Sequence, residues 1–548
     1  MDACVPVFSS LARFSAMHVT FVSLGSELIG VEYLSAYLKK YGHSTSLAHH
    51  PALFNDRFQL NMPLLAKLFD QDDRIVEYIL HLDPELIGFS CLTNTFEWSL
   101  EIARRVREQK RIPTIFGGVH PSAIPEFVLG YDEVDFVCES EGEVALLELC
   151  NDLECGGDGT GINNIWAKPD GEITRPPMVS SFLQDLDSLP FPDKELYAGA
   201  TPSRSVYRTM TARGCPYRCT FCFNNFFANL PDQGIEKDYV RRRSVDNVME
   251  ELHQGKERFD FRQLEFHDDI FTMHKDWLRE FLPRLKKEIN VPFYCETHAK
   301  FMDEEVAQLL KDGGCAGTKM GIQSLGEFSY KHTMLKRAEK EEDLIRALDA
   351  CRKVGVQLDA DHIFGLPEET QQHRDHALKF YREHTPGRIA CFWLTYFPGI
   401  EITTKAHEAG QITDEQLNDI HRGKLLWYHQ IQAMTAEGRK NLKENSGYMI
   451  AFHLMPVVPK FLRRFVVPNV IRRIPLMGTM SRGVMALKML KDFVFGGSFD
   501  AWVYLRGYLF FIFGRGRHLN KVPRSSRDDE SPPPAPDPVP VPVAQQSV

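Results

Sequence analysis

Three cysteines lie close together in one short loop, and their spacing indicates that they bind a single inorganic group. Cys215, Cys219 and Cys222 follow the pattern C-x3-C-x2-C within the stretch RGCPYRCTFC. A structural zinc site uses four protein ligands, and an electron-carrying four-iron cluster uses four cysteines. A loop with three cysteines therefore leaves one metal without a protein ligand, free to bind a substrate or a cofactor.

Two other interpretations of this loop are weaker. The cysteines of the loop could be ordinary buried apolar residues, but a turn containing glycine and proline is poor core material. A disulfide framework is disfavoured because the chain is long, its cysteines are scattered, and no secretory signal precedes them. We therefore expect an intracellular, cytoplasmic protein in a reducing compartment. The remaining cysteines are interpreted as apolar core residues: Cys4, Cys91, Cys138, Cys150, Cys155, Cys295, Cys315, Cys351 and Cys391.

The elements around the loop must place it at the edge of a sheet. A strand at residues 206–211 leads into the loop, and a helix with Ser244 as its cap is expected soon after. Further strands are predicted at residues 264–271 and 293–298, and the segments at residues 317–324 and 360–370 continue the strand–helix alternation. This alternation predicts an α/β domain whose parallel strands end at one common edge.

The cysteine pattern matches the signature of the radical S-adenosylmethionine (SAM) enzymes. The later motifs, including the turn that begins Gly365-Leu366-Pro367, resemble in their order the partial (β/α)6 TIM-type barrel of that family. The resemblance implies a 4Fe-4S cluster whose open iron is chelated by the amino and carboxylate groups of SAM. It also implies cleavage of SAM to a 5'-deoxyadenosyl radical.

The resemblance also implies a set of SAM contacts at the ends of the strands. Carboxylates suit the amino group of SAM, although one member of an adjacent pair could instead cap the following helix. Gln323 stands where relatives commonly carry glutamate, and an amide loses the charge-assisted part of a hydrogen bond. The expected SAM contacts are Phe221, Asp268, Asp269, Glu296, Gln323 and Ser324.

The first part of the chain predicts a second α/β domain. Apolar strands are expected at residues 18–23, 86–91, 114–116 and 136–138, with amphipathic helices at residues 31–40 and 98–108. This pattern predicts a doubly wound, Rossmann-like parallel sheet. Ligands of such sheets bind at the carboxyl ends of the strands, where glycine-rich loops fall in this sequence.

The position of this domain before the cysteine loop resembles the arrangement of cobalamin-dependent radical SAM enzymes. The motif Asp-x-His-x-x-Gly, whose histidine ligates cobalt, is absent, as it is from relatives that hold cobalamin without a protein ligand to cobalt. His120 is either a cofactor contact or a loop residue without that role. The expected cobalamin contacts are Ser90, Gly117, Gly118, His120, Glu141 and Gly142.

Composition and charge set the frame for these domains. The chain has 548 residues, of which 43% are hydrophobic and 25% charged, as in ordinary globular proteins. Residues 451–527 carry 14 basic and 2 acidic residues, whereas the chain as a whole has a net charge of −10. The acidic body argues against nucleic acid as a partner. We divide the chain into a leader (1–16), a cobalamin-type domain (17–175), a radical SAM domain (190–420), a basic helical extension (421–521) and a tail (522–548).

The extension contains a segment that could contact a membrane. A helix is expected at residues 415–436, and residues 456–513 alternate apolar and basic groups. The apolar run at residues 501–513 is too short to span a bilayer, so it fits either an interfacial helix on anionic lipid or a helix packed on the barrel. The proline-rich tail at residues 522–548 is expected to be disordered.

Together these features predict a radical SAM enzyme that methylates an unactivated carbon of a hydrophobic, lipid-like or other small-molecule substrate with the help of cobalamin. Two alternative catalysts are a non-methylating cyclase, oxidoreductase or rearrangement enzyme with both domains and a plain radical SAM oxidoreductase without cobalamin. A further alternative, which is not a catalyst, is a binding protein that senses cobalamin or redox state. A reductant such as flavodoxin or ferredoxin is expected as a partner.

Overall fold

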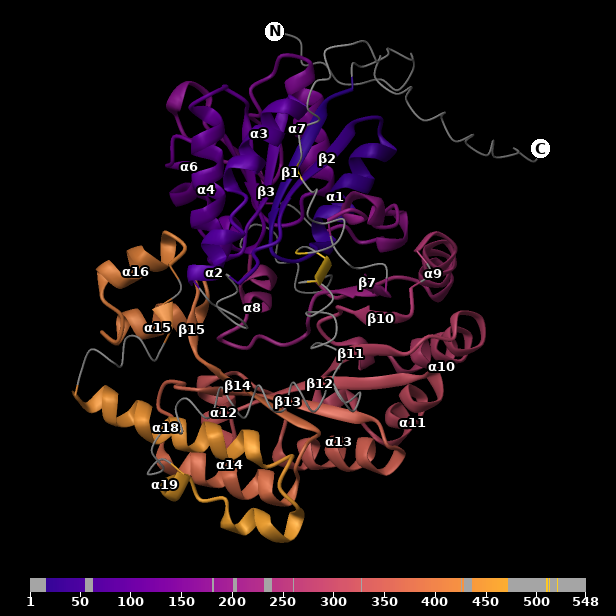
Figure 1. Ribbon diagram of the computed structural model, residues 1–548, viewed down its shortest axis with the longest axis vertical. Helices are drawn as coiled ribbons and strands as arrows, with labels where there is room; N and C mark the ends of the chain where they lie inside the picture. The colour runs from indigo at the N-terminus through magenta and orange to yellow at the C-terminus, as the bar shows by residue number, and fades with distance from the viewer. Residues whose placement is uncertain are drawn as a thin grey trace.

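The chain forms two α/β domains, the first on a mostly parallel sheet and the second on a parallel sheet, with a helical extension at the end (Figure 1). The computed structural model describes residues 16–54, 63–179, 182–200, 205–230, 239–259, 261–326, 328–424, 426–427 and 436–471, with residues 509, 510, 512 and 520. The leader, most of the segment at residues 501–513 and the tail at residues 522–548 lie outside the described residues.

The first sheet has the strand order β2-β1-β3-β4-β5-β6. Its first five strands are parallel, and β6 pairs antiparallel with β5 at the edge. This is a doubly wound sheet, as the sequence predicted, although the prediction did not include β2 or β6. The strands are β1 (His18–Leu24), β2 (Ser44–His50), β3 (Leu86–Ser90), β4 (Thr114–Gly117), β5 (Phe136–Cys138) and β6 (Ile165–Ala167).

Helices cover both faces of the first sheet because apolar side chains leave each strand in both directions. On one face α1 and α7 pack together through Leu38 and Leu146, and on the other α3 and α4 bury Ile79 and Phe96. The helices of this domain are α1 (Ile29–Lys40), α2 (Pro63–Leu68), α3 (Asp72–Leu82), α4 (Thr93–Arg107), α5 (Val119–Ala123), α6 (Pro125–Leu129) and α7 (Glu143–Glu154).

The second sheet has six parallel strands in the order β14-β13-β12-β11-β10-β7, which is the partial barrel that the sequence predicted. Ser244 accepts a hydrogen bond from the backbone N–H of Asn247 at 3.1 Å, so the predicted helix cap is confirmed. The strands are β7 (Val206–Thr209), β10 (Gln263–Phe266), β11 (Phe293–Thr297), β12 (Cys315–Gln323), β13 (Gln357–Phe364) and β14 (Arg388–Trp393). The helices packed on them include α9 (Val245–Phe259), α10 (Lys275–Arg284), α11 (Glu304–Gly313), α12 (Phe328–Met334), α13 (Glu341–Val354) and α14 (Gln371–Glu383).

After the barrel the chain forms further short elements. The predicted helix at residues 415–436 is wrong, because α16 ends at His421 and Gly423 follows in a left-handed conformation with φ +86°. Two-residue strands β15 and β16 then pair. The elements are β15 (Thr395–Tyr396), α15 (Glu401–Glu408), α16 (Asp414–His421), β16 (Leu426–Trp427), α18 (Ala436–Leu454), η8 (Lys460–Phe465) and α19 (Pro468–Ile471).

Two further observations concern the end of the chain. Asn520 donates to the backbone carbonyl of His49 at 2.8 Å, so this late residue returns to the edge strand of the first sheet. Within the described residues, no helix combines the length and the apolar character needed to cross a bilayer.

Candidate active site

The cysteine loop lies between β8 (Ala212–Arg213) and α8 (Phe223–Ala228). It begins at Gly214 with φ +86°, where a Cβ would lie 2.1 Å from the carbonyl oxygen of Tyr239, so only glycine fits. Within the loop, the N–H of Cys222 donates to the carbonyl of Cys219 at 3.0 Å. The Arg218 guanidinium donates to the carbonyl of Cys215, also at 3.0 Å. These contacts keep the three cysteines on one compact turn.

The three thiols are largely removed from water, and burial is the main influence on their acidity. Burial raises the pKa of Cys215 to about 12, and it also raises the pKa values of Cys219 and Cys222. Thiols of this kind ionise when they bind a metal, because the positive charge of the metal replaces the lost hydration. The donor set of one buried and two partly buried thiols on one turn therefore fits an iron–sulfur cluster with one open iron.

Two polar side chains that the sequence did not identify lie beside these sulfurs. The amide nitrogen of Asn224 is 3.7 Å from the Cys222 sulfur, and the positive charge of Arg337 lies close enough to lower the pKa of Cys219 against the effect of burial. Arg337 is fixed by Glu339, which accepts from its Nε at 2.8 Å. Donors beside cluster sulfurs tune the reduction potential. Asparagine and arginine occur throughout the sequence, so only their contacts in the structure single out Asn224 and Arg337.

The adjacent carboxylates after β10 have separate partners. Asp268 is buried and accepts hydrogen bonds from the backbone N–H and the hydroxyl of Thr211, so it ties β10 to the segment before the cysteine loop. Asp269 accepts from the Asn224 amide at 2.7 Å. Burial, reinforced by the charges of Asp268 and Glu296, raises the pKa of Asp269. Of this pair, only Asp269 binds the Asn224 amide, which also lies beside the Cys222 sulfur.

The end of β12 contains two polar atoms that fit a bound cofactor. Gln323 has φ +63°, a left-handed conformation that is uncommon for a residue other than glycine. The buried Oε1 of Gln323 and Oγ of Ser324 have no hydrogen-bond partner among the described residues. Buried polar atoms without partners are rare unless a ligand or water completes them. These two atoms therefore fit the polar groups of SAM.

The other two expected SAM contacts differ in their surroundings. Phe221 is half-buried and packs against an apolar cluster that includes Leu335 and Leu366. Its ring therefore lines an apolar wall directly before Cys222. Glu296 instead forms an ion pair with Lys319 at 2.7 Å, on neighbouring strands of the barrel.

Charged side chains line the inner face of the barrel. Along β13, Leu358, Ala360 and Phe364 pack into the helix-covered core, so Asp359 and Asp361 project to the opposite face. Asp361 lies 4.0 Å from Lys319, which also binds Glu296. Burial, with the charges of Glu296 and Asp359, raises the pKa of Asp361 to about 6 against the opposing effect of Lys319. The alternation along β12 and β13 is the sequence signal that could have identified these residues.

The carboxyl edge of the first sheet is made of small residues. Ser90 ends β3, and Gly117 and Gly118 follow each other at the end of β4. Gly118 has φ +95°, and a Cβ there would lie 2.8 Å from the carbonyl oxygen of Cys91. After β5, the Oγ of Ser140 is buried without a hydrogen-bond partner among the described residues. A Cβ at Gly142 would lie 3.2 Å from the Leu34 side chain and 3.4 Å from the Cys138 sulfur. Small residues and an unpaired hydroxyl at this edge fit a large cofactor, as expected for cobalamin.

His120 and Glu141 have protein partners in this structure. His120 is fully buried and lies near Thr93 Oγ1 at 3.2 Å and the carbonyl of His421 at 3.1 Å. Because a carbonyl only accepts, Nε2 donates to it and Nδ1 accepts from the threonine hydroxyl. Burial lowers the pKa of His120 to about 3. Both ring nitrogens are thus engaged, and the Glu141 carboxylate likewise binds two arginines.

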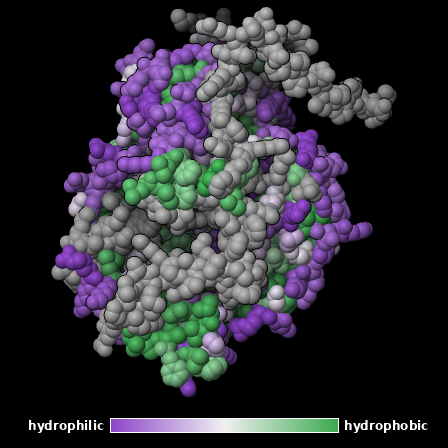
Figure 2. Space-filling model, viewed as in Figure 1, coloured by the Kyte–Doolittle hydropathy of each residue, from purple (hydrophilic) through white to green (hydrophobic). Residues whose placement is uncertain are grey.

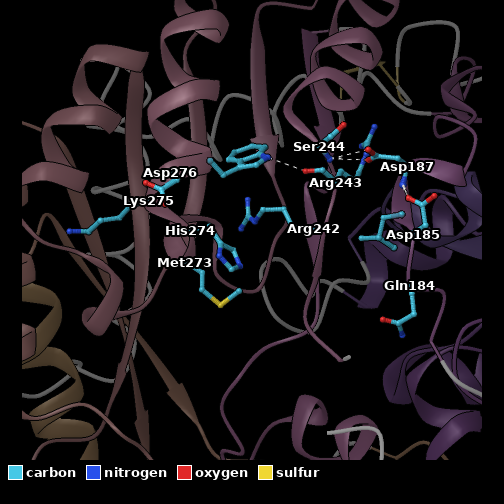
Figure 3. Close-up of a pocket in the computed structure, with 12 residues that line it drawn as sticks. Gln184, Asp185, Asp187, Arg242, Arg243, Ser244, Met273, His274, Lys275 and Asp276 are labelled. Carbon is cyan, nitrogen blue, oxygen red and sulfur yellow. Dashed lines mark hydrogen bonds between the residues drawn. The ribbon is translucent and has the colours of Figure 1, made fainter. Parts of the chain in front are cut away.

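A cavity of about 590 Å³ lies between the linker at residues 184–187 and the starts of α9 and α10 (Figure 3). Arg242 lines it and stacks over Trp277, 4.7 Å from the ring centroid. The N–H of Ser244 donates to the Asp187 carboxylate at 2.9 Å across its wall. Its lining includes none of the residues expected to bind SAM, the cluster or cobalamin.

Comparison with protein families identifies both halves of the chain. Residues 209–381 match the radical SAM superfamily, and residues 22–150 match the B12 binding domain. The first match contains the cysteine loop and the strand ends described above. The second contains all the residues expected to contact cobalamin.

Individual relatives and solved structures are also similar to this chain. An uncharacterized methyltransferase of Pyrococcus horikoshii is 26% identical over 318 residues, which cover 56% of this chain and 66% of the relative. The anaerobic magnesium-protoporphyrin IX monomethyl ester cyclase of Rubrivivax gelatinosus is 26% identical over 408 residues, 70% of this chain and 68% of the relative. The chain thus spans about two thirds of the length of these relatives. The solved structure of the cobalamin-dependent SAM radical enzyme OxsB, with aqua-cobalamin and SAM bound, has a TM-score of 0.64 and 15% identity, covering 92% of this chain and 84% of its own.

Proposed function

Since the chain belongs to the radical SAM enzymes that carry a cobalamin-binding domain, we propose that it transfers a methyl group to an unactivated carbon of a small-molecule substrate. The observation that carries this proposal is the pairing of two sites. A loop with three cysteines follows β8, and Arg213 on β8 and Arg241 on the strand paired with it bind the loop after β5 of the first sheet. Both edges contain buried polar atoms without partners among the described residues.

Each part of the chain has a defined task in this reaction. When bound, the cluster and SAM supply a hydrogen-abstracting radical and cobalamin supplies the methyl group. Cys215, Cys219 and Cys222 hold the cluster, and Asp269, Gln323 and Ser324 are proposed to orient SAM beside it. The small residues Ser90, Gly117, Gly118 and Gly142 are proposed to shape the cobalamin site by letting the chain segments at this edge pack closely. The apolar wall at Phe221 excludes water from the reacting groups.

The inner face of the barrel indicates what the substrate presents to it. Glu296, Lys319 and Asp361 form a charged group on adjacent strands, and a wholly apolar ligand would strip water from these charges without replacing its hydrogen bonds. We therefore propose a substrate with at least one polar or ionic group directed at this triad. A lipid-like substrate fits only if its polar end enters the barrel.

Anaerobic reconstitution with iron, sulfide and hydroxocobalamin, followed by SAM and dithionite, tests the proposed function. Mass spectrometry should detect 5'-deoxyadenosine together with S-adenosylhomocysteine. Radical cleavage of SAM gives the first product, and donation of the SAM methyl group gives the second. Deoxyadenosine without S-adenosylhomocysteine would instead favour the cyclase, oxidoreductase or rearrangement chemistry, for which the Rubrivivax gelatinosus relative is the precedent. Cofactor binding without cleavage in the presence of candidate substrates would favour the sensor. In the cell, a flavodoxin or ferredoxin is proposed to replace dithionite.

We further propose that the extension contacts anionic lipid. Phe461 is 72% exposed and Phe465 65% exposed on the short helix η8, beside the exposed bases Lys460 and Arg464. Figure 2 shows an apolar patch at the lower end of the molecule, where Figure 1 places the last helical elements. Aromatic and basic side chains on one surface are typical of interfacial membrane contacts.

Vesicle co-sedimentation tests this contact. The full chain should sediment with vesicles of anionic phosphatidylglycerol and much less with phosphatidylcholine, and the double variant Phe461→Ser/Phe465→Ser should lose most of that binding. Equal sedimentation of variant and wild type would contradict the lipid contact without affecting the catalytic proposal.

A further inference from the structure

A buried group of ion pairs joins the two domains directly beside the cysteine loop. Arg213 and Arg241 are opposite each other on the antiparallel pair β8 and β9 (Arg241–Arg242). Both reach the loop that follows β5 of the first sheet. Glu141 accepts from Arg213 at 3.1 Å, and its two carboxylate oxygens accept from the two Nη atoms of Arg241 at 2.9 Å each. Glu143 accepts from the second Nη of Arg213 at 2.6 Å.

The geometry makes Glu141 the centre of this contact. Its bond pattern with Arg241 is the bidentate fork that carboxylates and guanidinium groups form most strongly. It also accepts from the backbone N–H of Leu183 in the linker, at 3.0 Å. Burial alone would raise the pKa of Glu141, but Arg213 and Arg241 more than offset this and hold the pKa below its usual value.

The same contact continues into the cluster ligands. Arg213 precedes Gly214 and Cys215 in the chain, so its position fixes where the loop begins. The backbone of Gly214 packs against the Tyr239 carbonyl, two residues before Arg241. The Tyr239 hydroxyl donates to Asn224, whose amide lies beside the Cys222 sulfur and binds Asp269. An unbroken series of contacts thus runs from Glu141 to both ends of the loop.

We propose that Glu141 is a positioning residue that holds the cluster loop in register with the carboxyl edge of the first sheet. Through Arg213 and Arg241 it sets the orientation of Cys215 and of the Asn224 amide. In this way, the first domain controls the environment of the cluster and the binding of SAM beside it. The proposal relies on the cluster site but not on methyl transfer, and it assigns the Glu141 carboxylate to the domain interface rather than to cobalamin.

A second interdomain carboxylate provides a matched control. Glu27, in the first domain, is buried and binds Lys194 at 2.8 Å and Arg208 at 3.2 Å, on barrel strand β7. Arg208 lies inside a strand rather than next to a cysteine. Replacing Glu27 therefore removes a comparable buried charge from the same interface without a direct link to the loop.

The test compares Glu141→Gln, Arg241→Lys and Glu27→Gln as full-length proteins after anaerobic reconstitution. Iron content, the electron paramagnetic resonance spectrum of the reduced cluster with and without SAM, and SAM affinity are measured without any substrate. Glu141→Gln should weaken SAM binding by about 10-fold, the lower range for residues that act through a metal ligand, and alter the spectrum. Arg241→Lys, which keeps the charge but loses the fork, should show a smaller change in the same direction. Glu27→Gln should keep the wild-type spectrum and SAM affinity.

Two outcomes would overturn the proposal. Wild-type spectra and SAM affinity in Glu141→Gln would show that the contact does not reach the cluster. An equal change in Glu27→Gln would show a general loss of the interface rather than positioning. If Glu141→Gln does not fold, Arg241→Lys decides between these results alone. A separate measurement tests whether the three cysteines bind the cluster. If a variant without all three cysteines binds as much iron as the wild type, the cluster site is wrong.

Discussion

The two parallel sheets end in edges of opposite character. The edge of the first sheet includes small residues such as Ser90, Gly117 and Gly118, which offer few side-chain contacts. The edge and inner face of the second carry thiols, amides and charges, including Cys215, Gln323 and Lys319. A large cofactor held by shape needs room and backbone contacts, whereas a charged cofactor on a metal needs particular atoms. The comparison predicts that each edge can be disabled without the other.

The largest effect is expected at the thiol edge. The triple variant Cys215→Ala/Cys219→Ala/Cys222→Ala should lose the cluster and reduce formation of 5'-deoxyadenosine to background, because the loop contains no further cysteine. Absorbance spectra, iron analysis and mass spectrometry measure these losses. The variant Cys155→Ala, at an exposed thiol, serves as the control and should keep both. Loss of cobalamin binding in the triple variant would contradict the independence of the two edges.

A second prediction concerns the space at the first edge. Gly118→Ala should weaken hydroxocobalamin binding by about 10-fold or more, because the added Cβ collides with the Cys91 carbonyl and forces the loop to move. Gly156→Ala is a matched control, since Gly156 has φ +81° but open space around its Cβ. Gel filtration with an absorbance scan compares the bound cobalamin. Equal cobalamin binding by the two variants would show that Gly118 does not shape the site.

A third, smaller effect is expected at the end of β12. Ser324→Ala removes one buried hydroxyl, and the loss of a hydrogen bond to SAM of about 1 kcal/mol corresponds to roughly 5-fold weaker binding. Calorimetric titration of the reconstituted protein with SAM measures this change, while cobalamin binding should stay constant. Ser446→Ala, at an exposed serine, provides the control. Unchanged SAM affinity in Ser324→Ala would remove this hydroxyl from the SAM site.

The smallest effect is a pH dependence of stability in the barrel. With a folded pKa of about 6, above its ordinary value, Asp361 binds its proton more tightly in the folded than in the unfolded chain. The wild type therefore loses stability as pH rises from about 4 to about 6. Asp361→Asn should raise the melting temperature by a few degrees at pH 7.5, with a smaller difference at pH 5. A difference that does not depend on pH would show that Asp361 ionises normally.

Sequence reasoning reaches furthest where a pattern has one interpretation. The alternating strands predicted both sheets, which the structure confirms, and the cysteine spacing predicts the cluster loop. It did not identify Asn224 or Arg337, because amides and arginines have many uses and become informative only beside a sulfur. It also treated Asp268 and Asp269 as equivalent, whereas the fold directs one to Thr211 and the other to Asn224.

The sequence by itself therefore determined the two α/β folds and their order, and it predicts the ligands of the cluster. These features depend on local periodicity and on residues with a narrow chemistry. The tertiary structure alone decided how the domains meet. His120 forms a hydrogen bond with His421, and Glu141 forms ion pairs with Arg213 and Arg241. These partners are separated by between 72 and 301 residues in the sequence. Contacts over such separations depend on how two independently patterned domains pack, and no local pattern in the chain encodes them.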